Sequence, residues 1–134
     1  MTQKGWHTGT SICFHEAERI EVDSIGMKEI PSTAYYGVQS LRAKENFSMT
    51  GEKLRPEMIE ALAYVKKACA LANANAGVLS KEKAAAIETA CDLILKGKHH
   101  EAFIVDPIQG GAGTSINMNA NEVIANIAIT LLGG

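Results

Sequence analysis

The sequence has 134 residues, of which 46% are hydrophobic and 21% charged, and its formal net charge at pH 7 is −2. This composition is typical of a globular chain rather than a disordered one, and the length suits one domain or a segment of a larger protein. The small net charge gives no reason to expect nucleic acid or an anionic membrane as a partner. No apolar run approaches the roughly 18 residues of a membrane span.

The cysteine pattern indicates a reducing compartment. The three cysteines, Cys13, Cys69 and Cys91, lie far apart in the sequence. An odd number without close pairs argues against a disulfide framework and against a zinc site, so we expect reduced thiols and a cytoplasmic location. Residues 1–18 lack the continuous apolar run of a secretory signal, and we expect them to form a disordered tail.

A short β-hairpin is predicted where the regular pattern begins. Residues 19–23 alternate charged and apolar side chains, as a strand does. Residues 25–27 supply a turn, and residues 28–31 return as a second strand that ends at a proline. A short helix across residues 38–46 is expected to follow.

Two longer antiparallel helices are predicted next, over residues 57–76 and 81–96. Pro56 is well placed as the first residue of a helix, and Ser80 can cap the second one. An apolar stripe at helical spacing runs along the first helix. The stripe consists of Met58, Ile59, Leu62, Val65, Cys69 and Ala72. We expect the stripes of the helices to pack together and to leave an exposed apolar patch where a further domain docks.

The connection after these helices carries two adjacent histidines, His99 and His100. Neighbouring side chains point in different directions in most backbones, so joint metal ligation is not predicted, and we expect both rings to be exposed in a loop. Residues 103–105 are apolar and predict a short buried strand or extended segment.

A glycine-rich run, residues 109–115, precedes a predicted helix over residues 116–132, with Thr114 or Ser115 near its N-cap. Such a helix start has unpaired N–H groups and a partial positive charge, and it therefore suits a carboxylate or a phosphate. On local sequence alone, the simpler interpretation is that a hydroxyl caps the helix and the glycines turn the chain.

The last predicted helix is rich in asparagine, a mediocre helix former. Its asparagines are Asn117, Asn119, Asn121 and Asn126. One cause is structural, with amides that bond buried backbone or neighbouring helices, and the other is a polar pocket wall. Both interpretations stay open for Asn117, and the structural one is favoured for the other three.

Several of these segments resemble one enzyme family. Residues 109–126, QGGAGTSINMNANEVIAN, resemble the first signature region of the aspartase/fumarase superfamily. The segments RIEVDSIG (19–26), AYYGVQ (34–39) and RAKENF (42–47) resemble its N-terminal segment in the same order. The likeness covers about residues 19–134. It implies a mainly α fold, the N-terminal helical domain of that family, with a short β-hairpin near the N-terminus.

Within the superfamily, the likeness is greater to aspartate ammonia-lyases than to class II fumarases, which usually read SGTQSN where this chain has AGTSIN at 112–117. The resemblance implies reversible deamination of L-aspartate to fumarate and ammonia, without an organic cofactor, and no metal-binding residues are predicted in this chain. It also implies that the Thr114 hydroxyl binds the β-carboxylate of the substrate. Gly113, Ser115 and Asn117 would support the loop or lie just behind the site.

The chain departs from the family pattern in ways that bear on activity. Family members are several times longer, and the second and third signatures, with the serine base, have no counterpart in this sequence. Ile127 stands where an arginine is usual, and Ala102 where a glutamine is usual. The resemblance therefore implies an N-terminal part, inactive alone, of a homotetramer with shared active sites. A class II fumarase fragment and a non-catalytic truncated paralogue that acts as a binding module stay open as alternatives.

Overall fold

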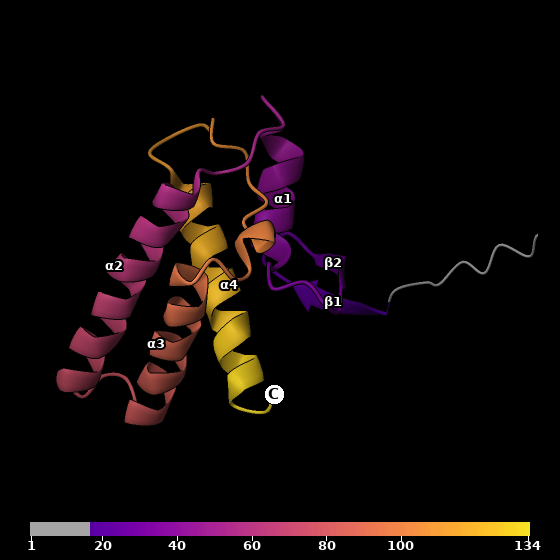
Figure 1. The fold of residues 1–134 in the computed structure, drawn as a ribbon. Helices are drawn as coiled ribbons and strands as arrows, with labels where there is room; N and C mark the ends of the chain where they lie inside the picture. The colour runs from indigo at the N-terminus through magenta and orange to yellow at the C-terminus, as the bar shows by residue number, and fades with distance from the viewer. Residues whose placement is uncertain (1–16) are drawn as a thin grey trace, which may run out of the picture.

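The computed structural model describes residues 17–134, so the predicted tail up to residue 16 lies outside the described residues (Figure 1). The elements in chain order are β1 (Glu18–Val22), β2 (Met27–Pro31), α1 (Val38–Asn46), α2 (Pro56–Asn75), α3 (Lys81–Leu95), a short 3-10 helix η1 (His100–Ala102) and α4 (Thr114–Leu131). The predicted mainly helical fold with a hairpin near the N-terminus is confirmed.

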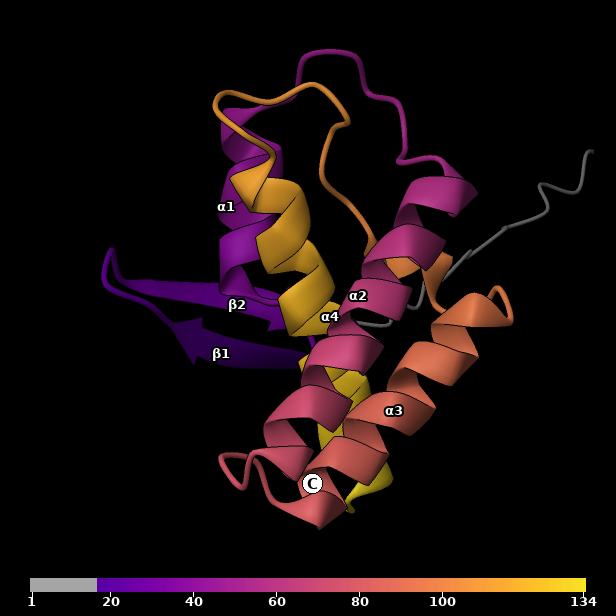
Figure 2. The same cartoon turned by 90° about the vertical axis from the view of Figure 1, so that its left-hand side faces the viewer.

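The helices form one packed body with the hairpin at its side. The long helices α2 and α3 are antiparallel neighbours, α4 packs against both, and α1 packs against α4 (Figures 1 and 2). The hairpin projects beside α1. The glycine-rich loop before α4 lies at the same end of the body as the connection between α1 and α2, and the chain ends at the opposite end (Figure 1).

The core is built largely from small and branched side chains of the helices. From α3, Ala90 and Ile94 are 0% exposed, and from α4, Ala120 and Val123 are also 0% exposed. Alanines at these contacts leave little between the helix backbones, which allows close packing. Phe103 is buried as predicted, although residues 103–105 form no strand with the rest of the described chain. No helix among the described residues is both long and apolar enough to cross a membrane.

The inward face of α2 differs from the predicted stripe. The side chains that α2 buries are those of Ile59, Ala63 and Ala70, whereas Met58 and Val65 are 46% and 56% exposed. Cys69 and Ala72 are exposed as well. The pattern favoured large side chains, but the close approach of α3 selects alanines for the contact face. Tyr64 and Leu71 of α2 are also exposed, and the apolar docking patch stays a prediction.

The hairpin divides its side chains between two faces, as the two-residue period of a strand requires. Arg19 pairs with Ile30 in the antiparallel register, and both face the helical body, where Ile30 is fully buried. Val22 pairs with Met27 on the other face, where they are 68% and 73% exposed. The strand begins at Glu18, one residue earlier than predicted.

Candidate functional site

The start of α4 is formed by a glycine rather than by a hydroxyl cap. Gly113 is the N-cap residue, with φ 82° and ψ 21°, and among the described residues no side-chain hydrogen bond caps the helix there. This left-handed conformation favours glycine. Thr114 and Ser115 are therefore the first and second helical residues, one and two positions past the N-cap. The simpler sequence interpretation, a hydroxyl that caps the helix, is wrong.

The first turn of α4 keeps hydrogen-bond donors available. Thr114 is exposed, and within residues 17–134 its hydroxyl has no hydrogen-bond partner. The N–H groups of Thr114 and Ser115 likewise have no partner in the described part of the chain. The next N–H group, that of Ile116, donates to Oε1 of Gln109 at 3.2 Å. An exposed hydroxyl beside free N–H groups at the positive end of a helix suits an anion.

The base of the loop is held by a buried carboxylate that the sequence did not reveal. Asp106 is 5% exposed and accepts from the N–H groups of Thr50 at 2.7 Å, Gly51 at 2.9 Å and Ile108 at 2.8 Å. Burial by itself would raise the pKa of Asp106, but these N–H groups and the Thr50 hydroxyl stabilise the charged form and lower the pKa to about 2. The start of the loop is thereby tied to the connection between α1 and α2.

The loop residues named from the sequence point to different neighbours. Ser115 is half-buried and lines a cleft of about 540 Å³ with Arg42 and Met118, between the hairpin tip, α1 and α4. Thr114 is not among the residues lining that cleft. Asn117 is exposed and faces α2, where its Oδ1 accepts from Nζ of Lys66 at 2.6 Å. The side chains of Thr114, Ser115 and Asn117 therefore do not converge on a single cleft.

Two of the remaining asparagines are structural, as predicted. Asn119 is 0% exposed, and its amide accepts from the N–H of Ile104 at 2.9 Å and donates to the carbonyl of Ala102 at 3.1 Å. Asn126 donates to the carbonyl of Tyr35 at 2.8 Å. Asn121 is exposed and has no hydrogen-bond partner among the described residues, so the structural role predicted for it is not found.

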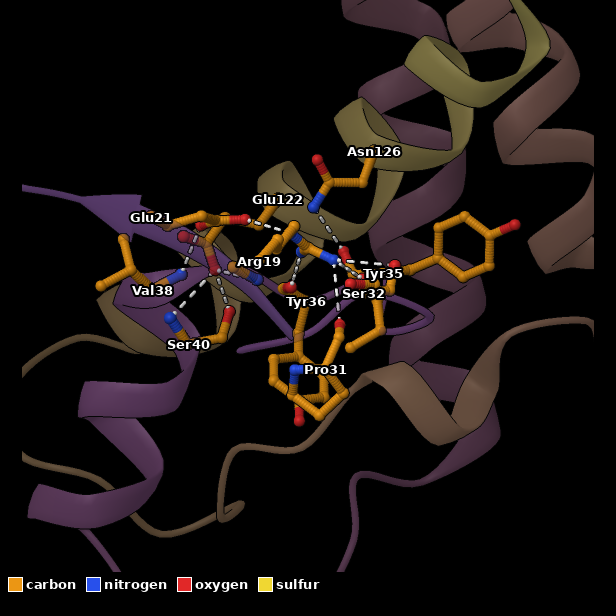
Figure 3. Close-up of polar contacts among 12 residues, drawn as sticks. Arg19, Glu21, Pro31, Ser32, Tyr35, Tyr36, Val38, Ser40, Glu122 and Asn126 are labelled. Atoms are coloured by element: carbon orange, nitrogen blue, oxygen red, sulfur yellow. Dashed lines mark hydrogen bonds and ion pairs between the residues drawn. The ribbon is translucent and has the colours of Figure 1, made fainter. Parts of the chain in front are cut away.

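A second carboxylate missed by the sequence reasoning, Glu122, fixes α4 against α1 (Figure 3). Its Oε2 accepts from the N–H groups of Gly37 at 3.0 Å and Ser40 at 2.9 Å, and its Oε1 accepts from that of Gln39 at 3.0 Å. The Ser40 hydroxyl also donates to this carboxylate. Glu122 thus caps α1 from another helix. A Cβ atom on Gly37 would lie 2.6 Å from Oε1 of Glu122, so a larger residue at this position would displace the capping carboxylate.

Arg19 joins the hairpin to the segment before α1 (Figure 3). Its Nε donates to Glu21 at 2.8 Å, and Oε2 of Glu21 accepts from the N–H of Val38 at 2.8 Å. The Arg19 guanidinium also donates to four carbonyl oxygens, those of Pro31 at 3.1 Å, Ser32 at 3.3 Å, Ala34 at 2.7 Å and Tyr36 at 2.8 Å. These contacts fix the approach to α1 without reaching the glycine-rich loop.

The adjacent histidines are packed rather than exposed, which corrects the sequence prediction. The ring of His99 meets that of Tyr35 edge-on, with centroids 4.6 Å apart, and Nε2 of His100 lies 2.9 Å from the carbonyl oxygen of Ile94. Both rings are half-buried because the chain turns tightly into η1 at this point. Residues 17–134 hold no group of three His, Cys, Asp or Glu side chains placed to bind a metal ion.

Comparison with known proteins identifies the family. A family model described as lyase matches residues 26–133. The chain is 60% identical to an aspartate ammonia-lyase of a Bacillus species over 115 residues, and 58% identical to that of Bacillus subtilis strain 168. Each of these matches covers 86% of this chain, and 25% and 24% of the respective relative.

The solved structures agree with the sequences. A fumarate lyase:delta crystallin from Brucella melitensis is 54% identical, with a TM-score of 0.84 over 87% of this chain and 28% of its own. A class II fumarase from Schistosoma mansoni is 32% identical, with a TM-score of 0.83 over 88% of this chain and 25% of its own. The chain spans about a quarter of the length of the curated relatives it matches. The signature motif, the fold and these matches show that the chain belongs to the lyase family and corresponds to the N-terminal domain of aspartase/fumarase superfamily members.

Proposed function

We propose that this chain is the N-terminal part of an aspartate ammonia-lyase, which converts L-aspartate reversibly to fumarate and ammonia. The main supporting observation is the first turn of α4, where the exposed Thr114 hydroxyl stands beside two N–H groups that have no partner within residues 17–134, at the positive end of the helix. Relatives described as aspartate ammonia-lyases are 50% to 60% identical, against 32% for the class II fumarase, which supports the ammonia-lyase over the hydratase.

The proposed role of Thr114 follows from the charge that develops in the reaction. Removal of the Cβ proton from aspartate increases the negative charge on the neighbouring β-carboxylate. A hydrogen bond from the Thr114 hydroxyl would strengthen as this charge grows, and such differential binding lowers the barrier. The helix dipole and the free N–H groups act in the same direction. The proposed enzyme uses no organic cofactor, is a cytoplasmic homotetramer and builds each active site from several subunits.

The 134-residue chain alone is expected to be inactive, since the family's second and third signatures, with the serine base, have no counterpart in its sequence. Absorbance of fumarate in the ultraviolet, with excess L-aspartate, measures this directly. Turnover that survives repurification of the isolated chain would contradict the expectation.

The role of Thr114 can be tested in a chimera in which this chain replaces the corresponding quarter of the Bacillus subtilis aspartate ammonia-lyase, to which it is 58% identical. Thr114→Val keeps the shape and removes the donor, and loss of one such donor typically lowers kcat by about 10²–10³-fold. Thr114→Ser keeps a hydroxyl and should retain much of the activity. Equal kcat/KM for Thr114→Val and the unchanged chimera would refute the role. Activity on L-malate in place of L-aspartate would instead favour a fumarase.

A further inference from the structure

A lysine from α2 reaches the first turn of α4. The Nζ atom of Lys66 lies 2.6 Å from Oδ1 of Asn117. Asn117 follows Thr114 by three residues, so both side chains lie on neighbouring positions of one helix face. This contact therefore lies beside the proposed carboxylate site, although it joins two different helices.

The chemistry of the pair fixes the orientation of the amide. A lysine ammonium has three donors and no acceptor, so only the oxygen of the Asn117 amide can face it. The amide NH₂ group must then point away from Lys66. Asn117 is exposed, and its NH₂ group has no acceptor within residues 17–134. Two oriented donors are thus left without a partner in this part of the chain, three residues along α4 from Thr114, and a carboxylate at the start of the helix can accept from them.

The adjacent lysine shows that this arrangement is not a general property of α2. Nζ of Lys67 lies 2.7 Å from Asp92 and 3.3 Å from Glu88, so two carboxylates of α3 neutralise it. Lys66 forms no ion pair with any carboxylate in the described part of the chain, and its partner is a neutral amide. The charge of Lys66 is consequently left to act on whatever anion binds at the start of α4.

We propose that Asn117 donates its amide NH₂ group to the dicarboxylate substrate beside Thr114, and that Lys66 is the positioning residue that orients this amide. This inference rests on the proposed function. It gives Asn117 a direct role in place of a supporting one, and it brings α2 into the substrate site.

The chimera described above provides the test, with kcat, KM and the inhibition constant of succinate, a dicarboxylate that cannot react. Asn117→Leu keeps the helix and removes the donors. A hydrogen bond to a charged group contributes about 1.5–3 kcal/mol, so kcat/KM should fall by about 10- to 100-fold. Succinate should bind correspondingly more weakly. Lys66→Met should cause a smaller fall in kcat/KM, and Lys66→Arg, which also offers only donors, should restore much of it.

Lys67→Met is the matched control, because it removes the neighbouring lysine and two ion pairs with α3. It should lower the melting temperature without altering KM for aspartate or the inhibition constant of succinate. In the isolated chain, the side-chain amide resonances of Asn117 in ¹⁵N-labelled protein should shift in Lys66→Met and remain in place in Lys67→Met.

The outcomes separate this inference from the function on which it rests. The inference alone would be overturned if Thr114→Val lost activity while Asn117→Leu kept kcat/KM within twofold of the unchanged chimera. The positioning role of Lys66 would be overturned if Lys66→Arg lowered kcat/KM as much as Lys66→Met does. The proposed function, and with it this inference, would be overturned if the assembled chimera had no lyase activity or if Thr114→Val left its kcat/KM unchanged.

Discussion

Replacement of Glu122 by alanine should destabilise the domain far more than the loss of a surface charge does. The Glu122 carboxylate accepts from the N–H groups of Gly37, Gln39 and Ser40. Gln39 is exposed, so water can replace the carboxylate there, whereas Gly37 and Ser40 are buried. A buried donor left without a partner costs about 1–3 kcal/mol. With some relaxation at the start of α1, we expect Glu122→Ala to lower the free energy of unfolding by about 2–4 kcal/mol.

Thermal unfolding followed by far-ultraviolet circular dichroism measures this effect. For a domain of this size, the loss corresponds to a fall in Tm of about 10 °C. Glu122→Gln keeps one acceptor oxygen and should lie between the parent and the alanine variant. Glu45→Ala is the control, because it removes a carboxylate whose side chain is 49% exposed in its pair with Lys28. Such surface pairs contribute about 0–1 kcal/mol. A fall in Tm for Glu122→Ala no greater than that for Glu45→Ala would refute the reasoning.

Two further predictions concern titratable groups. Because the pKa of Asp106 is lowered from 3.8 to about 2 in the folded state, its charged form stabilises the fold above about pH 4, and this contribution is lost as the pH falls through 2. The difference in Tm between the parent and Asp106→Asn should therefore be largest near neutral pH and vanish toward pH 2; a constant difference would contradict the assignment. Burial raises the pKa of the Cys91 thiol to about 11, whereas Cys69 is exposed. In a Cys13→Ser background, a thiol reagent should modify Cys69 in the native protein and Cys91 only after unfolding, and equal rates would refute this.

The sequence predicted the helices well because their boundaries depend on local chemistry. The predicted helix across residues 38–46 is α1, and α3 begins after Ser80, whose side chain accepts from the N–H of Lys83 at 3.3 Å. Pro56 is the first residue of α2, a position that suits the fixed φ of proline. Each of these features involves residues within a few positions of one another, and a one-dimensional pattern can reveal them.

The burial of α2 and the capping of α4 were harder to predict, for two different reasons. The face of α2 that packs is marked by Ala63 and Ala70, and small residues carry little weight in a hydrophobic pattern. At α4, Gly113 with its left-handed φ is the N-cap, so the helix begins at Thr114, two residues before the predicted start at residue 116. The motif located Thr114 near the helix start. The cap itself depends on which of the three glycines in the loop adopt a positive φ, and the sequence does not distinguish them.

The contacts that hold the loop and α1 in place lie beyond local patterns altogether. Glu122 and Gly37 are separated by 85 residues, and Asp106 and Thr50 by 56. An acidic residue inside a helical pattern is normally read as solvent-facing, and nothing near Glu122 in the sequence indicates that its acceptors serve another helix. Only the folded arrangement of α1 against α4 shows that α1, which has no side-chain cap of its own, is capped from a distance.

The polar groups of α4 fall into two sets: those beyond the first turn bond other segments, and those at the helix start are available to a ligand. Beyond the first turn, Asn119, Glu122 and Asn126 bond the backbone of two earlier segments, residues 102–104 and 35–40, and so fix the direction of the helix. At its start, the N–H groups of Thr114 and Ser115 have no partner within residues 17–134. Donors held in place in this way need no reorganisation when charge develops on a ligand, which is the condition for strong electrostatic stabilisation. A flexible loop with the same residues would lose that advantage, so loosening α4 at Glu122 should lower kcat in the chimera even though Glu122 lies two turns from Thr114.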